Sequence, residues 1–128
     1  MPVQEEYKID YPNDLYEKIL LHLEQKKPYL NLDYSLKSLA NELNTNITYV
    51  SKAINSIDGQ NFYHLINAYR IEDLKKEMQN DLKKAEQNYT LEYYYTKYGF
   101  KSQSTFNKAF KRNTGMTPSD YLINIKSN

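Results

Sequence analysis

The stretch from Tyr98 to Tyr121 constrains the fold of this chain more than any other feature of its sequence. Gly99 is typical of the end of a helix, because a residue without a Cβ atom enters the left-handed backbone conformation at little cost. Ser102 can then cap a second helix. The inward positions of that helix, at spacings of three and four, are Phe106, Ala109 and Phe110. The stretch therefore predicts a short helix, a tight turn and an amphipathic helix, which together make a helix-turn-helix.

The outward side of the second helix carries hydrogen-bonding groups and cations. Its residues are Gln103, Ser104, Asn107, Lys108 and Lys111. Gly115 is placed to end this helix, and Thr117 followed by Pro118 can cap and open the next one. A polar and cationic face of this kind is what a helix needs to enter the major groove of DNA.

This order of residues resembles the signature of the AraC/XylS family of transcriptional regulators. The residues that carry the resemblance are Gly99-Phe100, Gln103-Ser104, Phe106, Phe110-Lys111 and the run from Gly115 to Tyr121, and the resemblance covers roughly residues 33–124. It implies an all-α, homeodomain-like fold in which one long central helix joins two helix-turn-helix subdomains. It also implies a bacterial transcription factor that binds DNA sequence-specifically.

An internal repeat indicates another helix-turn-helix unit upstream of the stretch from Tyr98 to Tyr121. In chain order, the upstream unit is the first and this stretch belongs to the second. Val50 to Gly59 matches Phe106 to Gly115 at a constant offset of 56, and the apolar positions correspond. Three pairs are identical, namely Lys52 and Lys108, Ala53 and Ala109, and Gly59 and Gly115. We therefore expect two equivalent recognition helices in one chain.

Capping residues place the remaining helices. Ser35 can cap a helix over 36–43, and Asn46 can cap one from 47 to about 56. Asn61 can open the connecting helix, and Thr90 the second unit. The outward residues of the helix that follows Asn46 are Thr48, Tyr49, Ser51, Lys52 and Asn55.

The predicted layout has an N-terminal arm and connector helix over 1–32 and the DNA-binding domain over 33–124. The domain contains the first helix-turn-helix at about 35–57, the connecting helix at about 62–79, the second helix-turn-helix at about 90–113 and a C-terminal helix at about 118–126. Residues 80–89 are either a charged loop or an extra helical turn.

The extra N-terminal helix has two interpretations. Asn13 or Asp14 can cap it, and Pro28 stops it after about Lys27. Its apolar stripe consists of Leu15, Tyr16, Ile19, Leu20 and Leu23. The stripe either packs on the domain that follows, or it serves as a connector or dimer helix that descends from a sensor domain upstream.

Two further residues carry expectations about packing. Arg70 is similar to an arginine that the family places in its connecting helix, and a structural ion pair is the role expected for it. Tyr95 stands where Ala40 stands in the first unit, and we expect its ring to be buried. A buried tyrosine needs extra room and a partner for its hydroxyl group.

Charge and composition exclude several classes of function. The net charge is +1, but residues 90–128 hold six basic and two acidic residues, so the positive end coincides with the motif. The absence of cysteine excludes disulfides and thiolate zinc sites. His22 and His64 lack neighbours at ligand spacing, and the three glycines each follow a helix. We therefore expect no metal, no cofactor, no catalytic residue and no membrane contact, in a cytoplasmic protein that is not an enzyme.

The function expected is that of a transcription regulator domain whose two recognition helices read adjacent segments of the major groove, as the output domain of a longer sensor protein. Double-stranded DNA is the expected partner, and RNA polymerase is a second candidate. The ten outward residues above are the expected contacts. The alternative is a protein-interaction or dimerisation module with little DNA affinity, which the 14 tyrosines favour because aromatic residues are enriched at interfaces.

Overall fold

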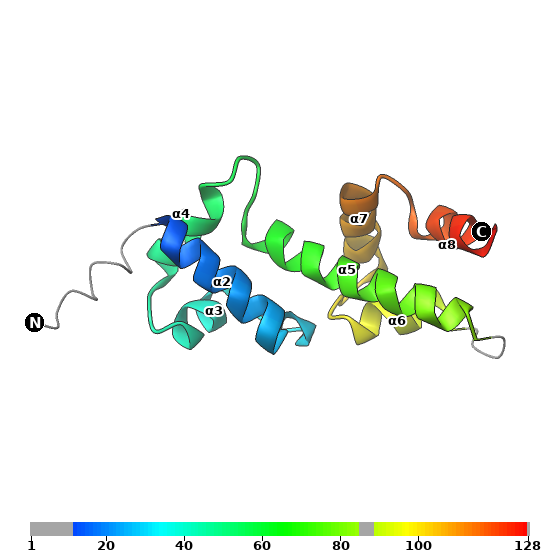
Figure 1. Ribbon diagram of the computed structural model, residues 1–128, viewed down its shortest axis with the longest axis horizontal. Helices are drawn as coiled ribbons and strands as arrows, with labels where there is room; N and C mark the ends of the chain where they lie inside the picture. The colour runs from blue at the N-terminus through cyan, green and yellow to red at the C-terminus, as the bar shows by residue number, and fades with distance from the viewer. Residues whose placement is uncertain (1–11, 85–88, 128) are drawn as a thin grey trace, which may run out of the picture. The chain divides into compact units, whose positions relative to one another are not determined.

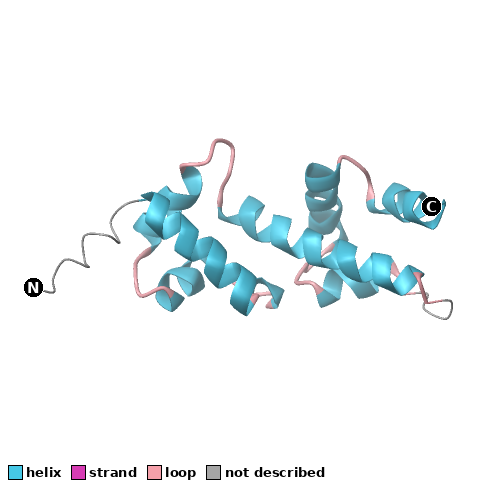
Figure 2. Cartoon of the chain, viewed as in Figure 1, coloured by secondary structure: helices cyan, strands magenta, loops and turns pink. Residues whose placement is uncertain are grey.

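The computed structural model describes residues 12–84 and 89–127 (Figure 1). Every regular element in these two ranges is helical (Figure 2). The elements are α2 (Pro12–Lys26), the 3-10 helix η2 (Pro28–Leu30), α3 (Leu36–Glu42), α4 (Ile47–Asn55), α5 (Phe62–Leu82), α6 (Leu91–Lys97), α7 (Gln103–Thr114) and α8 (Pro118–Ser127). The all-α prediction is confirmed. Residues 1–11 of the expected N-terminal arm lie outside the described residues.

The chain divides into two compact units, and the division falls within α5. One unit consists of Met1–Pro28 and Asp33–Leu65, and the other of Tyr29–Leu32 and Ile66–Asn128. The short segment Tyr29–Leu32 therefore belongs to the second unit, although it precedes the first helix-turn-helix in the sequence.

In the first unit, α2 and α3 both pack against α4. The apolar stripe of α2 is buried there, with Leu15 at 4% exposure and Ile19 and Leu23 at 0%. This packing is the first of the two interpretations of the N-terminal helix. The predicted cap at Asn13 or Asp14 is wrong, because the helix already begins at Pro12. Proline is favoured at a first helical position, where its missing N–H costs nothing.

The other predicted caps are all in place. In each case a side-chain oxygen accepts a hydrogen bond from the backbone N–H three residues later, which satisfies a donor that the helix itself leaves unpaired. The pairs are Ser35 with Ser38 at 3.1 Å, Asn46 with Tyr49 at 3.0 Å, Asn61 with His64 at 2.8 Å, Thr90 with Tyr93 at 3.1 Å, Ser102 with Thr105 at 3.2 Å and Thr117 with Asp120 at 3.1 Å. Local sequence signals are therefore sufficient to start these helices.

The second unit is built around an aromatic core. Its buried residues are Ile71, Leu74, Met78, Tyr94, Phe100, Phe106, Ala109, Phe110 and Tyr121. The prediction that Tyr95 is buried is wrong, because Tyr94 takes the buried position and Tyr95 lies half-buried at the edge of this core. The ring of Tyr95 still packs on Phe106, with 5.2 Å between the ring centroids.

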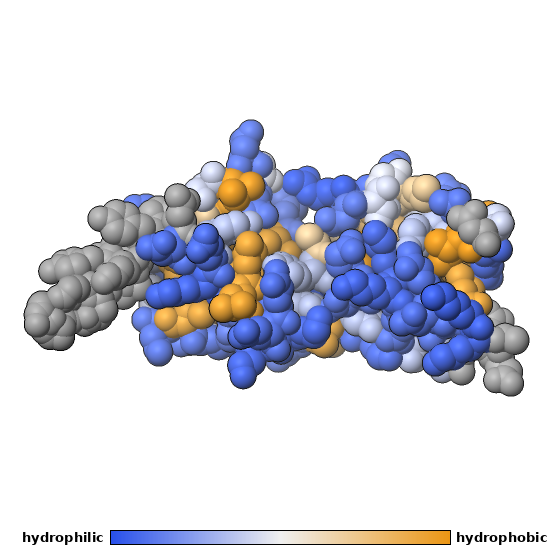
Figure 3. All heavy atoms as spheres, viewed as in Figure 1, coloured by the Kyte–Doolittle hydropathy of each residue, from blue (hydrophilic) through white to orange (hydrophobic). Residues whose placement is uncertain are grey.

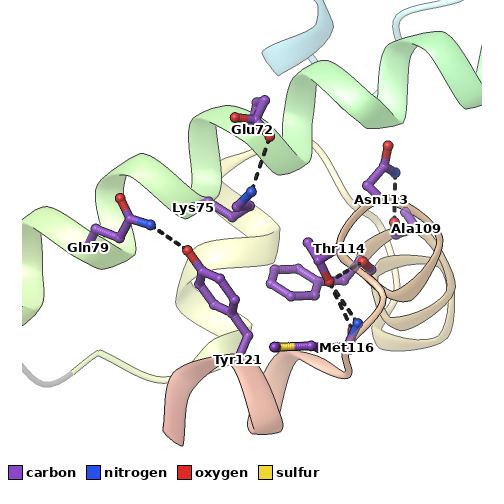
Figure 4. A network of polar contacts seen from close by, with 9 residues as sticks. Glu72, Lys75, Gln79, Ala109, Asn113, Thr114, Met116 and Tyr121 are labelled. Atoms are coloured by element: carbon purple, nitrogen blue, oxygen red, sulfur yellow. Dashed lines mark hydrogen bonds and ion pairs between the residues drawn. The ribbon is translucent and has the colours of Figure 1, made fainter. Parts of the chain in front are cut away.

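Polar contacts close the ends of α7 and α5 around this core (Figure 4). The hydroxyl of Thr114 donates to the Phe110 carbonyl at 2.8 Å and accepts from the Met116 N–H at 3.1 Å. The Gln79 side chain donates to the Tyr121 hydroxyl at 2.6 Å and so joins α5 to α8. Together these bonds fix the turn between α7 and α8.

The connecting helix is longer than expected, because α5 continues to Leu82 instead of ending near residue 79. Asp81 is buried and accepts a 2.8 Å hydrogen bond from the Tyr94 hydroxyl, so the last turn is held against α6. Of the segment 80–89, which was either a loop or an extra turn, residues 80–82 are helical and 85–88 lie outside the described residues.

Three of the tyrosine–carboxylate pairs in the described residues make the fold sensitive to high pH. Tyr34 donates to Glu42, Tyr94 to Asp81 and Tyr98 to Glu77. The pKa of all three hydroxyl groups is raised above the ordinary value of 10.0. Burial is the larger cause, and the adjacent carboxylate is the next. Because the folded-state pKa values are raised, the stabilisation is complete below the unfolded pKa and is lost as the pH rises above it.

We therefore expect the free energy of unfolding to fall above about pH 10, by up to about 1.4 kcal/mol per pH unit for each tyrosine. Urea unfolding followed by circular dichroism between about pH 8 and pH 11.5 would measure this slope. Tyr94→Phe should reduce the slope, whereas Tyr63→Phe should not, because Tyr63 is 70% exposed. Equal slopes in the wild type and Tyr94→Phe would contradict this assignment.

Candidate nucleic-acid interface

The first helix-turn-helix consists of α3, a three-residue turn and α4. Leu43 ends α3, and Asn44 follows in the left-handed conformation with φ of 58°. The next N–H, that of Thr45, donates back to the Ala40 carbonyl at 2.9 Å. A left-handed residue followed by this backward bond satisfies the last carbonyls of a helix and reverses the chain. The turn then delivers the chain to Asn46, the cap of α4.

The second helix-turn-helix repeats this geometry between α6 and α7. Gly99 has φ of 96°, and the N–H of Phe100 donates to the Tyr95 carbonyl at 2.9 Å. Lys101 then lengthens the turn by one residue before the cap at Ser102. Equivalent residues of the two units consequently differ in number by 55 up to the turn and by 56 after it. The repeat seen in the sequence therefore covers the second helices of the two units.

The turn of the second unit is braced by Arg70, which is 8% exposed. Its Nε donates to the Tyr29 carbonyl at 2.7 Å, and a terminal nitrogen donates to the Asn31 carbonyl at 3.1 Å. Gly99 lies directly against this contact, since a Cβ atom there would be 2.7 Å from Arg70 Nε and 2.8 Å from the Tyr29 carbonyl oxygen. We refer to Tyr29, Asn31, Arg70 and Gly99 as the Arg70 junction.

The ion pair expected for Arg70 is not found among the described residues, where its hydrogen-bond acceptors are uncharged oxygens. Its charge is met by carbonyl oxygens, including the side chain of Asn67 at 3.3 Å, and by the face of the Phe100 ring at 5.7 Å. Burial lowers the pKa of the guanidinium, yet an arginine stays charged in a protein. A buried charge held in this way ties the segment before α3 to the turn before α7.

The five residues predicted on α4 lie away from the core of the first unit. Thr48, Tyr49, Lys52 and Asn55 are exposed and Ser51 is half-buried. The opposite side of the helix is completely buried through Val50, Ala53 and Ile54, each at 0% exposure. Helix α4 therefore offers one polar side to solvent and packs with the other.

The five residues predicted on α7 form the corresponding face of the second unit. Gln103, Ser104, Asn107, Lys108 and Lys111 are all exposed. Phe106, Ala109 and Phe110 on the opposite side are buried. The structure therefore places all ten candidate residues on the second helix of a helix-turn-helix, five on each.

The faces of the two helices differ in charge. Helix α7 carries Lys108, Lys111 and Arg112, whereas α4 carries only Lys52. Cations on a helix that faces DNA neutralise phosphates, and each such contact releases a counterion. The face of α7 is accordingly better suited to phosphate binding.

Sequence reasoning missed Ile47, the first residue of α4. Its side chain is 44% exposed beside Thr48 on the outward side. The inward residues of this helix were assigned by their helical spacing, and Ile47 was assigned to neither side. No local signal identified it, because Phe62 also follows its cap, Asn61, directly and is buried at 6% exposure.

Burial accounts for some of the tyrosines in this chain. Those that are buried are Tyr29, Tyr34, Tyr94 and Tyr121, whereas Tyr49, Tyr63, Tyr89 and Tyr93 are exposed. The face of the molecule drawn in Figure 3 is mainly hydrophilic, with separate hydrophobic patches. The buried rings stabilise the folded units, so these four tyrosines do not support a protein-interaction surface.

The described residues contain no group of three or more histidine, cysteine, aspartate or glutamate side chains that could hold a metal ion. His22 lies 2.6 Å from Glu42, in a contact that the sequence spacing did not indicate. Over the same residues, no helix combines the length and apolar character needed to cross a membrane.

Comparison with known proteins identifies similar folds. A family model described as a helix-turn-helix domain matches residues 39–123. The C-terminal domain of AraT, a response regulator from Geobacillus stearothermophilus, has a TM-score of 0.67 and 23% identity over 85% of this chain and 84% of that one. A protein of unknown function from Listeria innocua has a TM-score of 0.66 and 25% identity over 84% and 93% of the two chains. A search of curated proteins found no match.

Proposed function

Because this chain belongs to the AraC-type helix-turn-helix family and is a DNA-binding regulator domain, we propose that it recognises specific DNA sequences through α4 and α7. The observation that carries the proposal is the division of each helix into a buried apolar side and an exposed side of hydrogen-bonding residues. In a helix-turn-helix, the second helix enters the major groove and its N-terminal residues contact base edges. Both helices would read adjacent segments of the groove.

The side chains of α7 supply the chemistry for direct readout. Gln103 and Asn107 can each donate to and accept from an adenine edge, and Lys108 can donate to the O6 and N7 atoms of guanine. Lys111 lies one turn further along the helix, where a phosphate contact is favoured. In α4 the corresponding contacts come from Thr48, Tyr49, Ser51, Lys52 and Asn55.

We further propose that the chain acts as the output domain of a longer protein, with a sensor domain upstream and RNA polymerase as a second partner. The likeness to a C-terminal domain of a response regulator supports this arrangement. Joining two binding domains through a dimerising partner would raise the effective concentration at a paired site.

Binding of lysine variants to DNA across a salt series tests the proposal. The duplex is first selected from a random pool by the wild-type chain at low salt. Lys111→Ala should weaken binding to selected and random duplexes alike and reduce the salt slope by about 0.9, because one phosphate contact is lost. Lys108→Ala should cost about 1–3 kcal/mol on the selected duplex and relax its preference.

Lys76→Ala is the matched control, since Lys76 is an exposed lysine of the same unit outside the helix-turn-helix. It should leave the salt slope unchanged. A Lys52→Ala variant that loses more affinity than either α7 variant would refute the assignment of most phosphate contacts to α7. If the wild-type chain enriches no duplex from the pool, sequence-specific binding itself is refuted.

A further inference from the structure

The first turns of α4 and α7 present different chemistry at equivalent positions. Ile47 corresponds to Gln103 at the offset of 56, and both are exposed at the first helical residue. The next position holds Thr48 in α4 and Ser104 in α7. The side chain of Thr48 thus carries a methyl group that Ser104 lacks. Both helices thus have a hydroxyl at the second position, but α4 begins with an apolar side chain where α7 begins with an amide.

Ile47 does not belong to the buried side of α4, since it is 44% exposed. The buried side of α4 is already complete through Val50, Ala53 and Ile54. The first turn is held by its cap, because the Tyr49 N–H donates to Asn46 Oδ1 at 3.0 Å. The isoleucine is therefore displayed at a fixed place at the end of the helix. Single exposed apolar residues are common on protein surfaces, so the position of Ile47 carries the argument.

That position is the part of a recognition helix that contacts base edges. On the major-groove edges of unmodified base pairs, the 5-methyl group of thymine is the apolar group available for contact. An isoleucine placed against guanine O6 and N7 would desolvate these acceptors without offering a hydrogen bond, which is unfavourable. The same side chain placed against a thymine methyl group buries apolar surface on both partners.

We propose that α4 selects thymine through apolar contact, with Ile47 and the methyl group of Thr48 packed on a thymine 5-methyl group, whereas α7 selects its bases by hydrogen bonds. The proposal rests on the function proposed above and specifies the chemistry of half of the DNA site. Ile47 is the residue that determines specificity in this half. The low charge of α4, with Lys52 as its one cation in the described structure, agrees with a helix that discriminates by methyl groups.

Replacing thymine by uracil in the selected duplex tests this directly, because the substitution removes the methyl group and keeps every hydrogen-bonding atom. Uracil at one thymine should weaken wild-type binding about fourfold, the effect of losing the burial of a single methylene-sized group. In Ile47→Ala the same substitution should have a clearly smaller effect, because only the methyl group of Thr48 remains to contact the thymine methyl group, and the thymine duplex itself should bind more weakly than it does to the wild type.

Two further variants distinguish the loss of this methyl contact from a general loss of DNA affinity. Ile47→Val keeps the branched methyl groups and should retain most of the uracil effect. Gln103→Ala, at the equivalent position of α7, should lose affinity and retain the uracil effect in full. Circular dichroism of each variant verifies the fold, and Ile47 is exposed enough for these changes to leave it intact.

The outcomes distinguish the inference from the function on which it rests. If the selected duplex binds tightly and uracil has no effect at any thymine, thymine selection is refuted and DNA recognition stands. The same holds if Ile47→Ala leaves affinity and the uracil effect unchanged, which would instead assign this side chain to a protein contact. If no duplex is selected at all, the proposed sequence-specific DNA recognition is refuted, and with it the thymine selection that rests on it.

Discussion

Replacing Phe106 by alanine is expected to lower the free energy of unfolding by about 3–5 kcal/mol. The side chain is completely buried, and its ring packs against Tyr95, Phe100 and Phe110 with centroid distances of 5.2, 5.5 and 5.7 Å. Removing it leaves a cavity between α6 and α7 that these rings cannot fill without moving. A loss of this size is a large part of the about 5–15 kcal/mol that stabilises a typical domain.

Urea unfolding followed by far-UV circular dichroism measures this loss. Ile123→Ala is the matched control, because Ile123 is also a large apolar residue of the second unit but is 64% exposed. It should change the stability by less than about 0.5 kcal/mol. If both variants unfold at the same urea concentration, Phe106 is not the centre of the core.

Replacing Gly99 by alanine is the second change with a large expected effect. Its φ of 96° is strained for any residue with a Cβ atom, at a cost of about 1–2 kcal/mol. The added atom would also lie 2.7 Å from Arg70 Nε and 2.8 Å from the Tyr29 carbonyl oxygen, so the Arg70 junction must move. Each buried group that loses its hydrogen bond then costs about 1–3 kcal/mol more.

Gly115→Ala provides the comparison that separates these two costs. Gly115 has φ of 81°, but no atom lies within 4 Å of the Cβ position there. Its replacement should therefore cost only the backbone strain, and Gly99→Ala should be less stable by the additional loss at the Arg70 junction. Equal unfolding midpoints for the two variants would show that the Arg70 junction can rearrange without a loss in the free energy of unfolding.

Local chemistry explains why much of the fold could be predicted from the sequence. A hydroxyl or amide side chain three residues before a free backbone N–H specifies a helix start, as at Ser35, Asn46 and Ser102, and no distant partner is needed. Glycine at the end of α6 and α7 acts in the same local way. The positions of the ten candidate residues followed from the spacing of apolar residues by three and four, because this spacing separates the buried and exposed sides of a helix.

The features that escaped prediction depend on contacts between distant residues or on choices that periodicity leaves undecided. Arg70 donates to the carbonyl of a residue 41 positions earlier, and no local pattern indicates such a partner. Tyr93, Tyr94 and Tyr95 are identical in type, so the sequence did not show which of the three faces the core. The extra turn of α5 contains Asp81, whose partner Tyr94 lies 13 positions later.

The Arg70 junction has a consequence for how this chain can be divided. The second unit takes Tyr29–Leu32 from the sequence that precedes the first unit's helix-turn-helix. A fragment trimmed to begin at α3 would remove two acceptors of a buried guanidinium and expose the turn before α7. The segments of the two units thus alternate along the chain, and no single cut releases either unit whole.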